Sequence, residues 1–198
     1  MIITTGPASI LPFNEKRATQ AAAEFLKRTD GQLNYMVLTK FLYLLDRAAL
    51  LNWGTPITGD SYRSMRWGPL LSRTHDLITE PLPDDEAKAS FWKNHIEQKN
   101  YDVVLRQDPG DDELSEADRD LIAKVFDKYF AKYKELNYNP FKFCEYLHTI
   151  LPEYKTAEQG QSFPLDYHDI LVAGNKQPEE IKDVEALLTS IGQMQRVR

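Results

Sequence analysis

Residues 34–54, NYMVLTKFLYLLDRAALLNWG, contain the longest apolar run of the chain, and their pattern decides the fold. Asn34 is placed to cap the start of a helix, and Gly54 is placed for a left-handed cap at its end. The apolar residues between them cover more than one helical face, which is typical of a helix buried inside a domain. Lys40, Asp46 and Arg47 interrupt the run, so it is too charged for a membrane span. We therefore expect a central core helix.

Segments on both sides of this core helix predict five more helices. Each begins with a residue type that favours a helix start: an Asn or Ser cap, or a proline, whose missing N–H costs nothing at the first helical position. Pro69 is one of these prolines, and Ser115 opens a capping box with Asp118. Gly192 is placed to end the last helix. The predicted helices cover residues 14–28, 69–79, 115–133, 139–150 and 178–192.

The segment at residues 91–106 changes from helical spacing to alternation of apolar and polar residues. This pattern predicts a β-hairpin that turns near Lys99 and Asn100. Residues 56–65 have the composition of irregular or short extended chain, and residues 156–176 are rich in loop signals. Alternating βα units do not fit this order of elements. The predicted fold is mainly α (α+β): a compact bundle of about six helices around the central apolar helix, with a small antiparallel β-hairpin or sheet.

The length of 198 residues fits one domain. We expect an irregular N-terminal lead-in at residues 1–13, a single domain at residues 14–192 and a flexible tail at residues 193–198. The first residues lack the basic region and apolar core of a signal peptide. Cys144 is the one cysteine, so no intrachain disulfide can form, in agreement with a reducing compartment. We expect a cytoplasmic protein with no membrane partner.

The charge and the titratable residues give little support to catalysis or nucleic-acid binding. A net charge of −6 argues against a nucleic-acid partner, because that affinity comes from Lys and Arg. Glu145 and His148 form one E-x-x-H motif, whereas di-iron bundles use two. Cys144 and His148 have the spacing of neighbours on one helix face, but no oxyanion loop lies nearby, so a buried Cys beside a core His is the favoured interpretation. We expect no catalytic residue, no metal and no cofactor.

Residues 56–71, PITGDSYRSMRWGPLL, differ from an ordinary linker. Trp67 precedes the Gly68-Pro69 step, and Arg63 and Arg66 come just before it. From the residues alone the favoured interpretation is a rigid connector, with Trp67 packed on the core and Asp60 capping a local turn. Trp and Arg are also the residue types that dominate protein–protein contacts, which leaves a binding role open.

These motifs together resemble the Panacea domain of the SocA-like antitoxin family, found in phage-associated proteins. The resemblance covers residues 15–190 and has two departures: Leu70 replaces the usual valine after Gly-Pro, and Glu153 precedes Tyr154 where an aromatic residue often follows the late proline. The matching residues are Leu42, Tyr43, Leu44, Leu45, Asp46 and Arg47, then Gly54, Pro56-Ile57, Asp60 with Tyr62, Gly68-Pro69, and Leu147-His148 with Pro152.

The resemblance implies an antitoxin that neutralises a cognate toxin by direct protein–protein binding in a toxin–antitoxin system, and not an enzyme. Some members instead deliver a toxin to a cytoplasmic protease, and such an adaptor would use the ends of the chain for docking. A DNA-binding regulator and a small enzyme that uses Cys144 and His148 remain the less favoured alternatives. The candidate partner-binding residues are Trp53, Asp60, Tyr62, Arg63, Met65, Arg66, Trp67 and His148.

Overall fold

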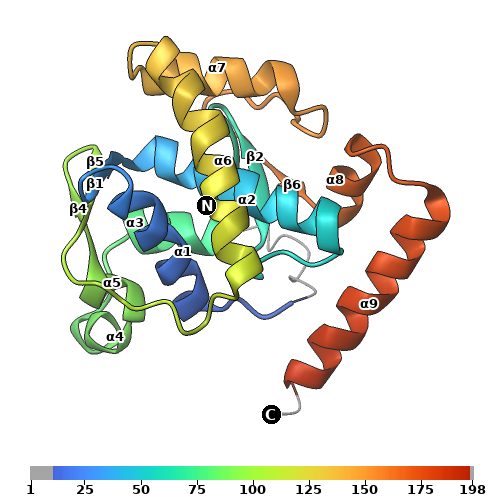
Figure 1. The fold of residues 1–198 in the computed structure, drawn as a ribbon, viewed down its shortest axis with the longest axis horizontal. Coiled ribbons are helices and arrows are strands. Elements are labelled where there is room, and N and C mark those ends of the chain that lie inside the picture. The colour runs from blue at the N-terminus through green and yellow to red at the C-terminus, as the bar shows by residue number, and fades with distance from the viewer. Residues whose placement is uncertain (1–10, 197–198) are drawn as a thin grey trace.

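The computed structural model describes residues 11–196, which form nine helices and two three-stranded antiparallel sheets. Helix α2 (Tyr35–Trp53) runs through the middle of the molecule, and α6 (Glu116–Glu135) crosses it, as Figure 1 shows. Helices α1 (Glu15–Lys27), α7 (Pro140–Ile150) and α8 (Tyr167–Ala173) also pack on α2. This arrangement confirms the expected mainly α (α+β) fold around a central helix, with more helices than the six predicted.

Helix α2 has the predicted ends. The Asn34 side chain accepts a hydrogen bond from the Met36 N–H, and Gly54 closes the helix with φ of 75°. Its interior is apolar on most sides, and Phe41 lies at the centre of an aromatic cluster with ring centroids 5.4 to 6.0 Å away. The rings around Phe41 come from three other helices: Phe25 on α1, Phe126 on α6 and Phe143 on α7.

The predicted starts of four further helices are confirmed. Asn14, Ser115 and Asn139 each accept backbone N–H groups as N-caps, and Ser115 forms the expected capping box with Asp118. Helix α9 (Pro178–Arg196) starts at the predicted proline. It does not end at Gly192, because one glycine costs a helix only about 1 kcal/mol, so the helix continues through residues 193–196. Residues 1–10 of the expected lead-in and residues 197–198 lie outside the described part.

The helix predicted to start at Pro69 is wrong at its N-terminus. Strand β3 (Gly68–Leu71) pairs with β2 (Tyr62–Met65), and helix α3 (Ser72–Thr79) begins only afterwards. Gly68 has φ of 95°, which lets the chain reverse after Trp67. Pro69 fits this strand because β3 is an edge strand, where a missing N–H is tolerated. A third strand, β6 (Ser162–Leu165), pairs with the other side of β2.

The second sheet contains the predicted hairpin. Strands β4 (Ile96–Lys99) and β5 (Asp102–Leu105) turn at Asn100 and Tyr101, and β1 (Gln32–Asn34) pairs with β5. The first part of the predicted strand is instead the short helix α5 (Phe91–His95), because Ser90 caps it. Helix α4 (Asp84–Ala89), β6 and α8 were not expected; α8 forms because Asp166 and Asp169 make a capping box inside the region assigned to loops. Within the described residues, no helix is both long and apolar enough to cross a membrane.

Candidate functional site

Asp46, one of the α2 residues in the family motif, is the centre of a buried network of hydrogen bonds. Asp46 has no exposed surface and accepts four hydrogen bonds, from the Ile57 and Thr58 N–H groups and the Thr58 and Tyr62 hydroxyls. Burial raises the pKa of Asp46 to about 6, and these donors oppose the rise. Asp46 therefore fixes the chain that leads from α2 into β2.

Asp60 has a similar architectural role. It accepts hydrogen bonds from the backbone N–H groups of Ser61, Arg73 and Thr74 and from the Thr74 hydroxyl. Two of these N–H groups belong to the first turn of α3, whose own cap residue, Leu71, supplies no side-chain acceptor. Burial raises the pKa of Asp60, and these hydrogen bonds oppose the rise. Asp60 thus caps α3 from a distance.

A buried ion pair ties α2 to the segment after α7. Glu153 accepts hydrogen bonds from the Tyr43 hydroxyl at 2.7 Å and from Arg47 Nε at 2.6 Å. The Glu153 side chain is fully buried, whereas 19% of the Arg47 side chain is exposed. Residue 153, a departure from the family pattern, is therefore a structural partner of two residues in the α2 motif.

Two aromatic side chains from the region of α7 pack against the β2–β3 turn. The Tyr154 hydroxyl lies 3.2 Å from the Met65 carbonyl and 3.1 Å from the Arg66 carbonyl and donates to them. The His148 ring stacks on Tyr154 with centroids 4.1 Å apart. A Cβ atom at Gly68 would lie 3.2 Å from His148 Nε2, so the turn approaches His148 more closely than most side chains allow. His148 therefore packs between Tyr154 and Gly68 of the turn.

The outer side of this turn carries the remaining candidates, of which Arg66 is exposed and Trp67 is half-buried. The Trp67 ring packs on Phe141 of α7 with centroids 4.8 Å apart, and the Arg66 guanidinium lies 5.2 Å from the Trp67 ring centroid. Arg63 and Met65 are half-buried on β2, alternating with the buried Tyr62 and Ser64. We call Arg63, Met65, Arg66, Trp67 and Phe141 the turn surface.

The structure does not bring all predicted residues to this surface. Asp60 and Tyr62 are buried, and Trp53 lies at the far end of α2, about 20 Å along the helix from Lys40, which contacts β3. Trp53 instead lines a pocket of about 320 Å³ with Val184 and Leu187 of α9. Sequence reasoning missed Phe141 and Tyr154, whose roles depend on contacts between distant segments.

A known protein family matches the part of the chain that contains this site. The family model described as "Antitoxin SocA-like, Panacea domain" matches residues 38–150, which are 113 of the 198 residues. The chain belongs to this family. The match runs from α2 to the end of α7, so it includes the Asp46 network and the turn surface. Neither the comparison with curated proteins nor the comparison with solved structures returned a match.

The Panacea domain buries a lysine, Lys40, next to the β2–β3 turn. Lys40 of α2 is 2% exposed, and its Nζ donates to the Pro69 carbonyl at 2.9 Å. Burial raises the pKa of Cys144 and lowers that of His148, and both shifts oppose a thiolate–imidazolium pair. His148 Nε2 is buried without a well-aligned hydrogen bond, although the Trp67 backbone lies near enough to favour its protonation. This arrangement favours a structural role for Cys144 and His148.

The buried ammonium of Lys40 predicts a pH dependence of stability. Burial lowers the pKa of Lys40 from 10.5 to about 8, and the Cys144 charge opposes this only in part. Between these values the unfolded chain holds a proton that the folded chain has released, so the free energy of unfolding rises with pH. We expect wild type to gain about 2 kcal/mol relative to Lys40→Met between pH 8 and 9.5 in urea denaturation. A difference that stays constant with pH would contradict this.

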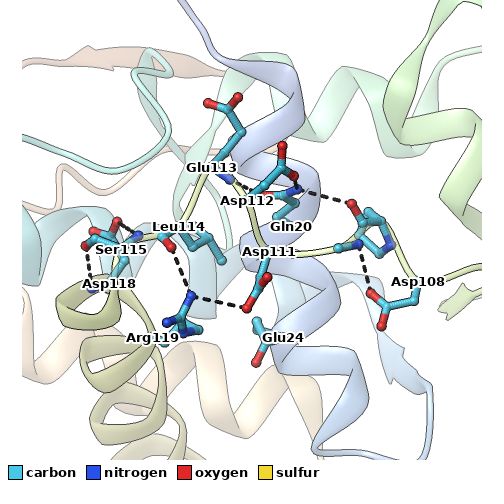
Figure 2. A network of polar contacts seen from close by, with 12 residues as sticks. Gln20, Glu24, Asp108, Asp111, Asp112, Glu113, Leu114, Ser115, Asp118 and Arg119 are labelled. Atoms are coloured by element: carbon cyan, nitrogen blue, oxygen red, sulfur yellow. Dashed lines mark hydrogen bonds and ion pairs between the residues drawn. The ribbon is translucent and has the colours of Figure 1, made fainter.

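The acidic run after β5 forms an ordered loop in the Panacea domain. Figure 2 shows the loop crossing α1, with the buried Gln20 side chain at its centre. The Gln20 amide donates to the Pro109 carbonyl and to Asp112, and it accepts from the Glu113 N–H. Arg119 of α6 pairs with Asp111. The loop therefore connects α1 with α6 through its own hydrogen bonds and ion pair.

Within residues 11–196, no cluster of three or more His, Cys, Asp or Glu side chains is arranged to hold a metal ion.

Proposed function

We propose that this Panacea domain is an antitoxin that neutralises a cognate toxin by direct binding, and that the turn surface is the centre of the contact. Membership of the SocA-like antitoxin family supports the role. The Arg66–Trp67–Phe141 stack supports the location, because Trp and Arg are the residue types that supply most binding energy at protein interfaces. Phe141 has 46% of its surface exposed, so the stack is open to a partner.

The turn surface is also held in place by contacts within the protein. Tyr154 fixes two carbonyl groups of the turn, and β2 is paired on both sides. A surface that is ordered in the free protein loses less conformational entropy on binding, which favours affinity.

Co-expression with the adjacent gene tests the proposal. We expect the neighbour's product to arrest growth alone and to be neutralised by this protein. Trp67→Ala should weaken the complex by at least about 30-fold, the effect of a binding hot spot. Trp53→Ala is the matched control, because it removes an exposed Trp at a distance from the turn surface.

Two outcomes contradict the proposal. A neighbour that is harmless alone, or that stays toxic beside this protein, removes the antitoxin role. Full neutralisation by Trp67→Ala together with loss by Trp53→Ala would move the contact to the pocket between α2 and α9.

Delivery of the toxin to a cytoplasmic protease is the second proposal. Helix α9 exposes Leu187 and Met194, two apolar side chains on one helix that a protease could bind. Deleting residues 193–198 should then lengthen the half-life of the toxin in the cell while its binding stays intact. An unchanged half-life argues for neutralisation by binding alone.

A DNA-binding role has less support. The chain carries a net charge of −6, and lysines of α6 lie over neighbouring aromatic rings, so part of the positive charge of this helix is engaged within the protein. Lys128 lies 5.0 Å from the Tyr129 ring centroid, and Lys132 lies 5.1 Å from that of Tyr146 while also pairing with Glu135.

A further inference from the structure

An aromatic pocket lies between the β1–β5 pair and the connection from α6 to α7. It has a volume of about 360 Å³, and its walls contain Phe130, Tyr133 and Tyr138. Pro140 also lines it, and Phe141 of the turn surface follows directly in the chain. The pocket therefore lies next to the proposed toxin contact and is not part of it.

The three rings contact one another. The Tyr133 and Tyr138 rings meet edge to face with centroids 5.5 Å apart, and both lie 6.2 Å from Phe130. Asn137 and Tyr138 both have positive φ, 56° and 54°. For an aromatic residue this backbone conformation is rare and carries strain. The strained turn holds the half-exposed Tyr138 ring against Tyr133.

A carboxylate completes the pocket. Asp102 of β5 lines it, and Gln32 donates to its Oδ2 at 2.7 Å. Tyr133 lines the same pocket, and burial and the nearby Asp102 charge both raise the pKa of Tyr133. Among the described residues no Lys, Arg or His pairs with Asp102, although most acidic residues around α1 have such a partner. Its charge is available to a ligand.

Aromatic faces beside an unpaired carboxylate attract a cation. A cation over a Tyr or Phe ring interacts with the negative ring face, and Arg does so more often than Lys. The protein already places one cation near a ring of this group, because Lys134 Nζ lies 5.5 Å from the Phe130 ring centroid. A guanidinium also matches the flat carboxylate with paired N–H groups.

We propose that this pocket binds an arginine side chain presented by the protein partner. The guanidinium stacks on Tyr138, and its N–H groups donate to Asp102. The assignment of this arginine to a toxin rests on the proposed function. The preference of the pocket for arginine does not depend on that function. The pocket thus adds a specificity contact beside the turn surface.

Titration of the full chain with N-acetyl-arginine methylamide tests the pocket directly. The matched probes are the citrulline analogue, which keeps the shape and loses the charge, and the lysine analogue. Binding is followed by the ring NMR signals of labelled tyrosines. We expect saturable shifts at Tyr133 and Tyr138, at least threefold weaker binding of the citrulline and lysine probes, and weaker binding at higher salt.

Variants locate the site. Tyr138→Ala and Asp102→Asn should each weaken the arginine probe at least threefold, and Tyr138→Phe should retain it because the ring remains. Phe163→Ala, which removes an exposed aromatic ring from the other sheet, should leave binding unchanged. Equal binding of the citrulline probe, tighter binding of the lysine probe, or an undiminished affinity in folded Tyr138→Ala overturns the inference. Failure of toxin neutralisation with normal probe binding would count against the proposed function only.

Discussion

Asp46→Ala should lower the free energy of unfolding by about 4 kcal/mol, because it leaves buried donors without an acceptor. The Ile57 and Thr58 N–H groups are fixed by the backbone and cannot turn elsewhere. Each unpaired buried donor costs about 1–3 kcal/mol, and the Thr58 and Tyr62 hydroxyls lose the same partner. The high cost of burying the carboxylate offsets part of this loss.

Urea denaturation of wild type and Asp46→Ala measures the effect. Asn52→Ala is the control on the same helix, because Asn52 is exposed and should change stability by less than about 0.5 kcal/mol. A loss below about 1 kcal/mol in Asp46→Ala would contradict the role of Asp46 as the organiser of residues 57–62.

Glu153→Ala has the second-largest expected effect on stability. Removing one partner of a buried ion pair costs about 3–5 kcal/mol, because the remaining charge stays in a poorly solvated place. Arg47 keeps 19% of its side chain exposed and can reach water in part, so we expect the lower end, about 3 kcal/mol. The Tyr43 hydroxyl also loses its acceptor.

The matched control is Glu158→Ala, which removes an exposed acid from the same segment. Thermal unfolding should show a large drop in Tm for Glu153→Ala and little change for Glu158→Ala. The Tyr154 contacts with the turn follow Glu153 directly, so Glu153→Ala should also weaken toxin binding. Equal stability of the two variants would mean that the ion pair contributes nothing.

The parts of the fold that depend on local signals could be predicted from the sequence. Asn34, Ser115 and Asn139 cap helices through contacts within a few residues, and such contacts leave a mark in the sequence. Gly68-Pro69 was misread because proline suits both the first turn of a helix and an edge strand. Only the pairing of β3 with β2 separates the two, and the sheet is completed by β6, which pairs with the other side of β2 and lies about a hundred residues away in the chain.

The candidate site was predictable only in part for the same reason. Trp67 and Arg66 stand out by residue type, and the structure places them on one exposed turn. Their partner Phe141 and the supporting Tyr154 come from distant segments, and no spacing in the sequence links them. Asp60 also stood out by its place in the family motif, but its buried position and its bonds to α3 show an architectural role.

Amide hydrogen exchange of the complex with the neighbouring gene's product tests whether the turn surface is the toxin contact. We expect slower exchange on binding at residues 63–68, which carry most of the turn surface, and at residues 141–145, the part of α7 that begins with Phe141. We expect unchanged exchange in α9 and around Trp53, which lie away from that surface. Protection confined to α9 and the end of α2, with no change at residues 63–68, would contradict a toxin contact at the turn surface.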